Sequence, residues 1–162
     1  MSDHDSGEAV IAILEAESQL SRRMLRVAEA KREALISADL ETLAPLVREL
    51  EDLTTALSRL EHDRIAHARA AAGDPVGPEL DCATLAERLG GAAGARLVAL
   101  RDELRESLAE LKGVNAGNAC LVQQALVSNE RLLKLVRGAA TSTYAPSGAA
   151  VEAPLLRRAW SA

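Results

Sequence analysis

A run of leucines between residues 43 and 60 places the strongest constraint on the fold. They recur in steps of three and four residues, at Leu43, Leu46, Leu50, Leu53, Leu57 and Leu60. This spacing puts all of them on one side of an α-helix, where other helices can cover them, and no β-strand has that period. Charged and polar residues fill most positions between them. The segment is therefore predicted to be an amphipathic helix that packs against other helices.

Composition favours one helical domain. The chain has 162 residues, of which 48% are apolar but only 1% are aromatic, and none is Phe. A core of Ala, Leu and Val without aromatic rings is typical of long helices packed side by side. The two aromatic residues, Tyr144 and Trp160, follow the last helical pattern, so aromatic packing is not expected to hold the core together.

The first half of the chain is predicted to be a helical hairpin. Residues 8–37 carry a broad apolar stripe, and Asp39 is suited to cap the start of the next helix. We expect a short turn at residues 39–42, a distortion at Pro45, which lacks a backbone N–H, and a second helix that continues to about Ala72. Charged side chains on the first helix are expected to pair along that helix on a solvated face. These are Glu15, Glu17, Arg22, Arg23, Arg26 and Glu29.

Glycine and proline residues interrupt the helical pattern in the next part of the chain. Two of each between residues 73 and 78 end the second helix, and residues 79–89 are predicted to form a short helix in this second connection. The glycine cluster at residues 90–94 is expected to be a flexible linker. It is a poor phosphate-binding loop, because it follows no strand and lacks a Lys-Ser/Thr pair. A third long helix is predicted over residues 95–137.

The apolar seam of the third helix contains polar residues and extends beyond the predicted length of the first two helices. Its predicted positions are Leu97, Leu100 or Arg101, Leu104, Leu108, Leu111, Asn115, Asn118, Val122, Ala125, Asn129, Leu132 and Val136. Asparagines in such a seam lower stability but fix the register of the helices. At about 1.5 Å per residue, the third helix would span roughly 65 Å and the first two roughly 45 Å each. Its C-terminal end is therefore expected to extend beyond them.

An uncovered apolar stripe of this kind marks an interaction surface, commonly for another amphipathic helix. Apolar residues without obvious partners within the chain include Leu126, Leu132, Leu133, Leu135 and Val136. Self-association would cover the stripe equally well. The residues predicted to bind a partner are Val122, Leu126, Asn129, Leu132, Leu133 and Val136.

Charge and motif content argue against several classes of function. The formal net charge is −5, and no basic stripe interleaved with aromatics supports nucleic-acid binding. The longest uncharged run, residues 113–129, is too rich in Asn and Gln to span a membrane. The acidic N-terminus lacks the features of a secretory signal, so the protein is expected to stay in the cytoplasm.

No catalytic or metal-binding constellation is visible in the sequence. Cys82 and Cys120 have no CxxC partner and are expected to be packed, reduced thiols. His62 and His67 are five residues apart, a poor spacing for metal ligands on a helix, and are expected to be exposed. We therefore predict no enzyme activity, no cofactor and no metal site.

Beyond the third helix, the composition turns to Ala, Ser, Thr, Gly and Pro. This change divides the chain into a helical domain, residues 1–138, and a flexible C-terminal tail, residues 139–162. The expected fold is all-α: an elongated antiparallel bundle of three long helices, with a short helix in the second connection.

The order of these features resembles the FlgN-type flagellar export chaperones. The resemblance rests on the acidic N-terminal hairpin with its turn at residues 38–43, the leucine-rich second helix, and the late segment 111–122 with Asn115 and Asn118. It also rests on the Thr-Tyr-Ala-Pro-Ser-Gly sequence at residues 143–148. Ala145 stands where the family pattern has glycine, and the chain after residue 148 lies outside the resemblance.

The resemblance implies a small cytosolic chaperone without an ATP site. Such a chaperone binds the C-terminal amphipathic segments of hook-filament junction proteins, prevents their premature assembly and delivers them to the flagellar type III export gate. The tyrosine after the last helix, here Tyr144, is the residue that the resemblance associates with gate docking. The alternative function is a structural coiled coil or a self-associating helical adaptor, and a homodimer without client fits either.

Overall fold

The structure, a computed structural model, describes residues 3–72 and 82–142. These residues form four helices and no strand: α1 (Asp3–Ile36), α2 (Leu40–Ala72), α3 (Cys82–Leu89) and α4 (Gly91–Ser142). The all-α class predicted from the sequence is confirmed. The chain divides into two compact units, unit 1 (Met1–Ala119) and unit 2 (Cys120–Ala162), and α4 contributes residues to both.

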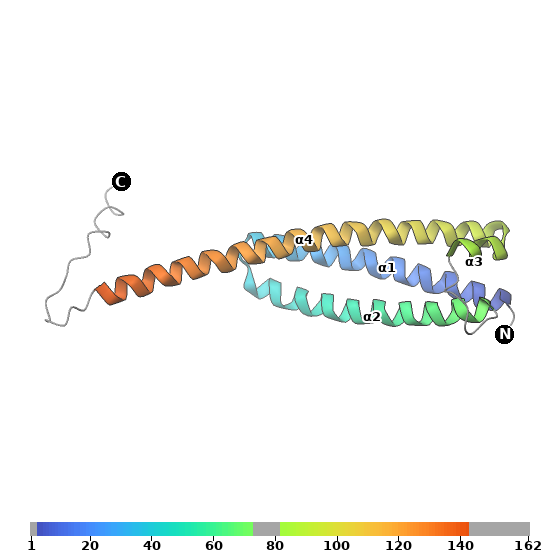
Figure 1. Cartoon of the computed structure of the whole chain (residues 1–162), viewed down its shortest axis with the longest axis horizontal. Helices are drawn as coiled ribbons and strands as arrows, with labels where there is room; N and C mark the ends of the chain where they lie inside the picture. Colours follow the sequence, from blue (N-terminus) through green and yellow to red (C-terminus); the bar gives the residue numbers. More distant parts are fainter. Residues whose placement is uncertain (1–2, 73–81, 143–162) are drawn as a thin grey trace. The chain divides into compact units, whose positions relative to one another are not determined.

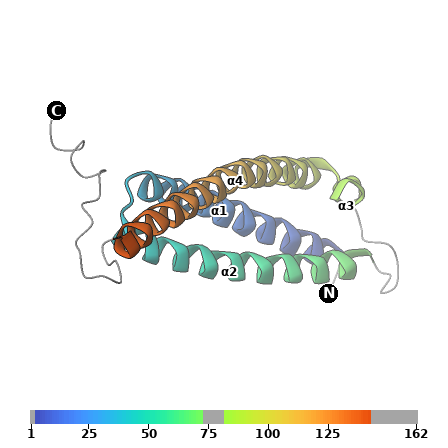
Figure 2. The same cartoon turned by 60° about the vertical axis from the view of Figure 1, so that its left-hand side comes forward.

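In unit 1, helices α1 and α2 lie side by side and run antiparallel, joined by a tight turn (Figures 1 and 2). Ala38 adopts a left-handed conformation with φ of 55°, and the backbone N–H of Asp39 donates to the carbonyl of Ala34 at 2.9 Å. This is the bonding pattern of a helix C-terminus closed by a left-handed residue. The turn therefore satisfies the last carbonyls of α1 without a glycine.

Asp39 caps α2, as predicted. Its Oδ1 accepts a hydrogen bond from the backbone N–H of Thr42 at 3.0 Å, and its Oδ2 accepts one from the Thr42 hydroxyl at 2.6 Å. These bonds favour the carboxylate and lower the pKa of Asp39. The helix begins at Leu40 and continues through Pro45, so the separate turn expected at residues 39–42 is wrong. Because Pro45 has no N–H, the carbonyl of Glu41 loses its helical donor, and the exposure of Glu41 leaves water as a substitute.

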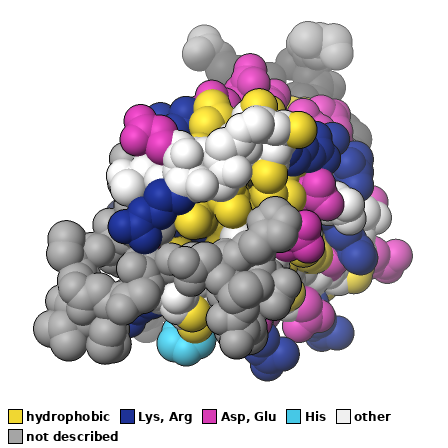
Figure 3. Space-filling model, turned by 90° about the vertical axis from the view of Figure 1, so that its right-hand side faces the viewer, with side chains coloured by type: hydrophobic (Ala, Val, Ile, Leu, Met, Phe, Trp, Pro, Cys, Tyr) yellow, Lys and Arg dark blue, Asp and Glu magenta, His cyan; other side chains and the backbone are white. Residues whose placement is uncertain are grey.

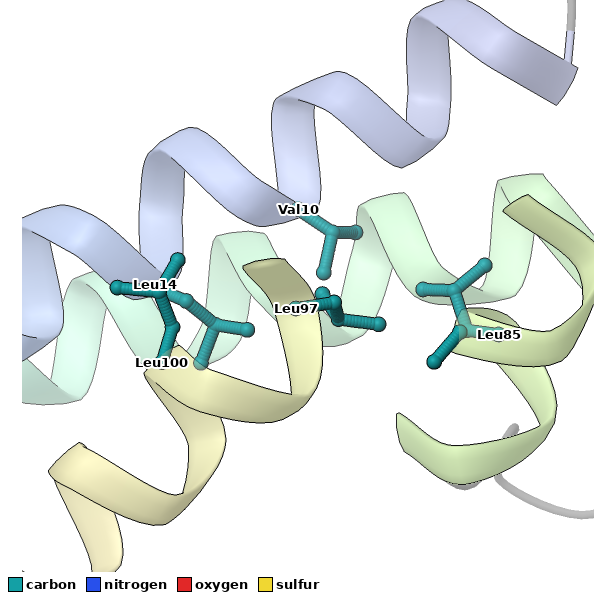
Figure 4. Packing of buried hydrophobic residues seen from close by; sticks show 6 residues of the cluster. Val10, Leu14, Leu85, Leu97 and Leu100 are labelled. Carbon is teal, nitrogen blue, oxygen red and sulfur yellow. The ribbon is translucent and has the colours of Figure 1, made fainter. Parts of the chain in front are cut away.

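Two apolar clusters hold unit 1 together. One joins α1, α2 and α4 through Met24, Leu53 and Leu111, with Leu46, Leu50 and Leu57 of the leucine seam packed against it. Of the six seam leucines, Leu53 is buried and the others are half-buried. The second cluster joins α1, α3 and α4, and in Figure 4 Val10, Leu14, Leu85, Leu97 and Leu100 point toward one another. The leucine seam of α2 thus helps to form the core of unit 1. The most deeply buried leucines, Leu97 and Leu100, lie in α4 instead.

A tight corner joins α3 to α4. Gly90 and Gly91 have φ values of 63° and 49°, a conformation that glycine adopts without steric cost. Gly94 is buried, and a Cβ at this position would overlap the backbone carbonyl of Ala86 in α3. The flexible linker expected at residues 90–94 is therefore wrong, because α4 already begins at Gly91 and the glycines pack α3 closely against it.

Helix α4 has 52 residues, against 34 in α1 and 33 in α2. The third long helix is thus the longest, as predicted, and its end at Ser142 lies beyond the predicted end at Arg137. None of the described helices combines the length and the apolarity needed to cross a membrane. The division into a domain of residues 1–138 and a tail of residues 139–162 remains a prediction.

Candidate docking surface on helix α4

The contact between α1 and α4 in unit 1 contains buried polar side chains. The hydroxyls of Ser21 and Ser107 lie 2.9 Å apart, and Nδ2 of Asn118 donates to the carbonyl of Ala28 at 2.9 Å. Asn118 is only 2% exposed, so its predicted place in the seam is correct. Its bond to one particular carbonyl of α1 supports the expected role in fixing the register of the two helices.

Within unit 1, the seam of α4 differs from the predicted one at two positions. Leu108 and Asn115 are exposed, whereas Ser107 is buried and Val114 is half-buried. The sequence pattern favours Leu108 because it is apolar, but the small Ser107 fits against Ser21 and satisfies its hydroxyl there. The seam therefore passes through Leu104, Ser107 and Leu111, still in steps of three and four.

Charged residues of α1 pair between helices rather than along α1. The side chain of Glu17 is 2% exposed and accepts hydrogen bonds from Nε of Arg64 in α2 at 3.1 Å. Burial raises the pKa of Glu17, and the positive charge of Arg64 opposes that rise. More exposed ion pairs join α1 to α2 or α4: Arg23 with Glu49, Arg22 with Glu103, and Arg96 with Glu15. The solvated face predicted for α1 is thus wrong for Glu17, which lies inside unit 1.

In unit 2, residues 120–138 of α4 carry a stripe of exposed apolar side chains, named here the α4 stripe. Leu132 is 60% exposed, Leu133 54% and Val136 65%. The stripe consists of Val122, Leu126, Leu132, Leu133, Leu135 and Val136, with exposed Asn129 among them. All six residues predicted to bind a partner therefore lie on the surface of unit 2, where another chain has access to their side chains.

The opposite side of this segment is mostly polar. Gln123, Gln124, Arg131 and Lys134 lie there, and Nε2 of Gln124 approaches Sγ of Cys120 at 3.7 Å. Val127, which is 39% exposed, is an isolated apolar residue on that side. The segment is thus amphipathic, and isolated surface residues such as Val127 are common in proteins.

Other candidate sites are weaker. Among the described residues, no cluster of three or more His, Cys, Asp or Glu side chains is placed to hold a metal ion. Cys82 is half-buried, whereas Cys120 is exposed and not packed as expected. His67 is half-buried rather than exposed, with Nδ1 buried and lacking a hydrogen-bond partner within the described part of the chain.

Charged side chains do not gather into one large patch on the face drawn in Figure 3. Among the described residues there, Lys and Arg side chains alternate with Asp and Glu side chains. An open groove along α1 includes Arg22 and Arg23 in its lining, but both already pair with carboxylates. Tyr144, predicted to dock at an export gate, and the sequence around it lie outside the described residues.

These features define an all-α protein that exposes the apolar face of a long helix. Comparison with known families identifies it further. The chain belongs to the FlgN family, because the family model described as FlgN protein matches residues 1–152. FlgN proteins are flagellar export chaperones, and the resemblance drawn from the sequence is thereby confirmed. No curated protein and no solved structure matches the chain.

Proposed function

We propose that this protein is a cytosolic chaperone for hook-filament junction proteins. It binds their C-terminal amphipathic segments on the α4 stripe, prevents premature assembly and delivers them to the flagellar type III export gate. The observation that carries this proposal is the exposure of the α4 stripe in a member of a chaperone family. In this proposal the three long helices form an elongated antiparallel bundle that supports the stripe.

Burial of apolar area supplies the binding energy. Full burial of a Leu or Val side chain contributes about 1.5–3 kcal/mol, and several stripe residues are more than half exposed. Part of the gain is offset by the entropy lost on association. While the client segment is bound, its own apolar face is hidden, so the chaperone suppresses client assembly by mass action and needs no bound nucleotide.

A triple substitution tests the stripe. Changing Leu132, Leu133 and Val136 together to Ser should weaken binding of a full-length junction protein at least about 100-fold, roughly 3 kcal/mol, measured by titration calorimetry. Helicity by circular dichroism should remain, because these side chains are exposed. Val127→Ser is the matched control, since Val127 is exposed outside the stripe, and it should bind normally. Unchanged affinity in the triple variant would refute the assignment of this surface.

Gate docking is proposed separately for Tyr144. Support comes from the family membership and from the position of Tyr144 after the last helix in the sequence. Tyr144→Ala should leave client binding intact and reduce association with the export gate in a pull-down assay. If Tyr144→Ala lost client binding as well as association with the gate, the proposed role of Tyr144 in gate docking alone would be wrong.

A self-associating helical adaptor is the second candidate. The same exposure of the α4 stripe favours it, because a second copy would also bury these side chains. Light scattering over a concentration series separates the two functions. A tight dimer that persists when a client protein is added supports the adaptor. A monomer, or a dimer that dissociates when a client protein is added, supports the chaperone.

A further inference from the structure

The α4 stripe is wider than one partner helix covers. A helix turns about 100° per residue, so Leu133 and Leu135 project in directions roughly 160° apart around the helix axis. They flank the line through Leu132 and Val136 from opposite sides. When only two helices pack together, each buries a narrow seam, the two apolar positions a and d of every seven residues. Leu133 and Leu135 are too far apart around the helix for one such seam, although 54% of Leu133 and 69% of Leu135 are exposed and need covering. One docked helix would leave at least one of these leucines in water.

In unit 1, the same helix contributes to an apolar cluster built from three helices. There, Leu111 of α4 is 6% exposed and belongs to a cluster that includes Met24 of α1 and Leu53 of α2. Side chains of α4 and of two other long helices thus share one apolar cluster in unit 1. A broad stripe with large residues beyond the a and d positions is the pattern of a helix in a bundle.

Charge differs between the two edges of the stripe. By its position on the helix, Arg137 lies on the Leu133 side of the stripe and Arg131 on the Leu135 side. Glu130, the only acidic residue between 120 and 138, also lies on the Leu133 side and balances Arg137 there, whereas Lys134 lies on the opposite, polar side of the helix. Only the partner helix beside Leu135, next to Arg131, would meet a cationic edge, so acidic residues on that helix are electrostatically favoured.

We propose that the α4 stripe binds a pair of amphipathic helices from one client chain, packed side by side, the one beside Leu135 having an acidic outer edge, rather than a single helix. The complex is then a three-helix arrangement of α4 with two client helices, comparable to the apolar cluster that α4 shares with α1 and α2 in unit 1. This inference rests on the proposed function and specifies the kind of client segment. It implies that a single terminal helix of the client fills only half of the surface.

Cysteine protection tests the number of helices. Leu133→Cys and Leu135→Cys are introduced one at a time into the full chain, with Cys82 and Cys120 changed to Ala. Maleimide labelling is followed with and without a saturating full-length junction protein. We expect client to slow labelling at both positions at least about tenfold, which requires only ~1.4 kcal/mol of protection. Val127→Cys is the matched control and should label equally fast in both conditions.

Each other outcome overturns the inference in a distinguishable way. Protection of only one of the two cysteines means that a single helix binds, and the proposed chaperone function survives. A complex in which neither cysteine is protected places the client elsewhere and contradicts the proposed site as well. Concentration-dependent protection of both cysteines without client means that a second copy covers the stripe. Failure of the unsubstituted chain to bind any junction protein rejects the proposed function itself.

Discussion

At the scale of single residues, Glu17 is the position where sequence reasoning went furthest wrong. Its neighbours in the sequence place it among charged residues at i to i+4 spacing, which predicts a solvated face. In the structure it is buried and paired with Arg64, 47 residues away. The sequence does not contain the information that Arg64 faces Glu17. The buried Ser21–Ser107 pair was missed for the same reason, whereas the buried Asn118 was found because it interrupts an apolar repeat.

The pKa of Glu17 makes a prediction about pH. Burial raises this pKa above 4.5, so the folded chain holds the proton more tightly than the unfolded chain. The stabilising contribution is fully present below the unfolded pKa and is lost as the pH rises through the folded pKa. The free energy of unfolding of the wild type, measured with urea, should therefore fall relative to that of Glu17→Gln as the pH rises above about 4.5.

The double variant Glu17→Gln, Arg64→Met is the control for this titration. It should show the same shallow pH dependence as Glu17→Gln, because Arg64 stays charged over this range. If the wild type instead gains stability relative to Glu17→Gln as the pH rises, attraction to Arg64 outweighs the burial of the carboxylate.

At the scale of elements, the helices were predictable and the corner between α3 and α4 was not. Periodic leucines and the Asp39 cap predict where α2 lies, and both signals are local in the sequence. A glycine cluster, by contrast, has two opposite meanings: a flexible linker or a close contact between backbones. Only the proximity of Gly94 to the carbonyl of Ala86 decides between them.

Substitution of Gly94 tests this close contact. Gly94→Ala places a methyl group against the backbone of α3, which cannot move aside as a side chain can, and overpacking of this kind costs typically 1–3 kcal/mol. Thermal and urea unfolding should show that loss. Gly113→Ala and Gly117→Ala are matched controls in the same helix, because a Cβ at either position meets open space. Both should gain up to about 1 kcal/mol from helix propensity. A stable Gly94→Ala variant would contradict the close packing.

At the scale of the whole molecule, the two units carry different kinds of residues. Both apolar clusters and the bond from Asn118 lie within unit 1, whereas the candidate binding residues lie in unit 2. The predicted length of the third helix pointed to this separation, because only a longer helix carries apolar residues without partners. The nature of the partner was not readable from periodicity, since a client and a second copy would cover the same stripe.

Removal of most of unit 2 tests this separation. A chain ending at residue 126 keeps about two turns of α4 beyond Asn118, which protects that bond from fraying at the helix end. We expect cooperative unfolding with a free energy within about 1 kcal/mol of the full chain, since the described side chains that are removed, residues 127–138, are exposed. Client binding should be lost. Non-cooperative melting of the shortened chain would show that unit 1 depends on unit 2.

The buried hydroxyl pair between α1 and α4 has a consequence for the order of folding during synthesis. Ser21 and Ser107 are 86 residues apart, and Asn118 reaches a carbonyl 90 residues before it. The α1–α2 hairpin closes through a short turn at low entropic cost, but these contacts form only after the ribosome has released nearly all of unit 1. For that interval, the nascent hairpin presents an uncovered apolar face. A member of a chaperone family thus itself exposes apolar surface while it is being made.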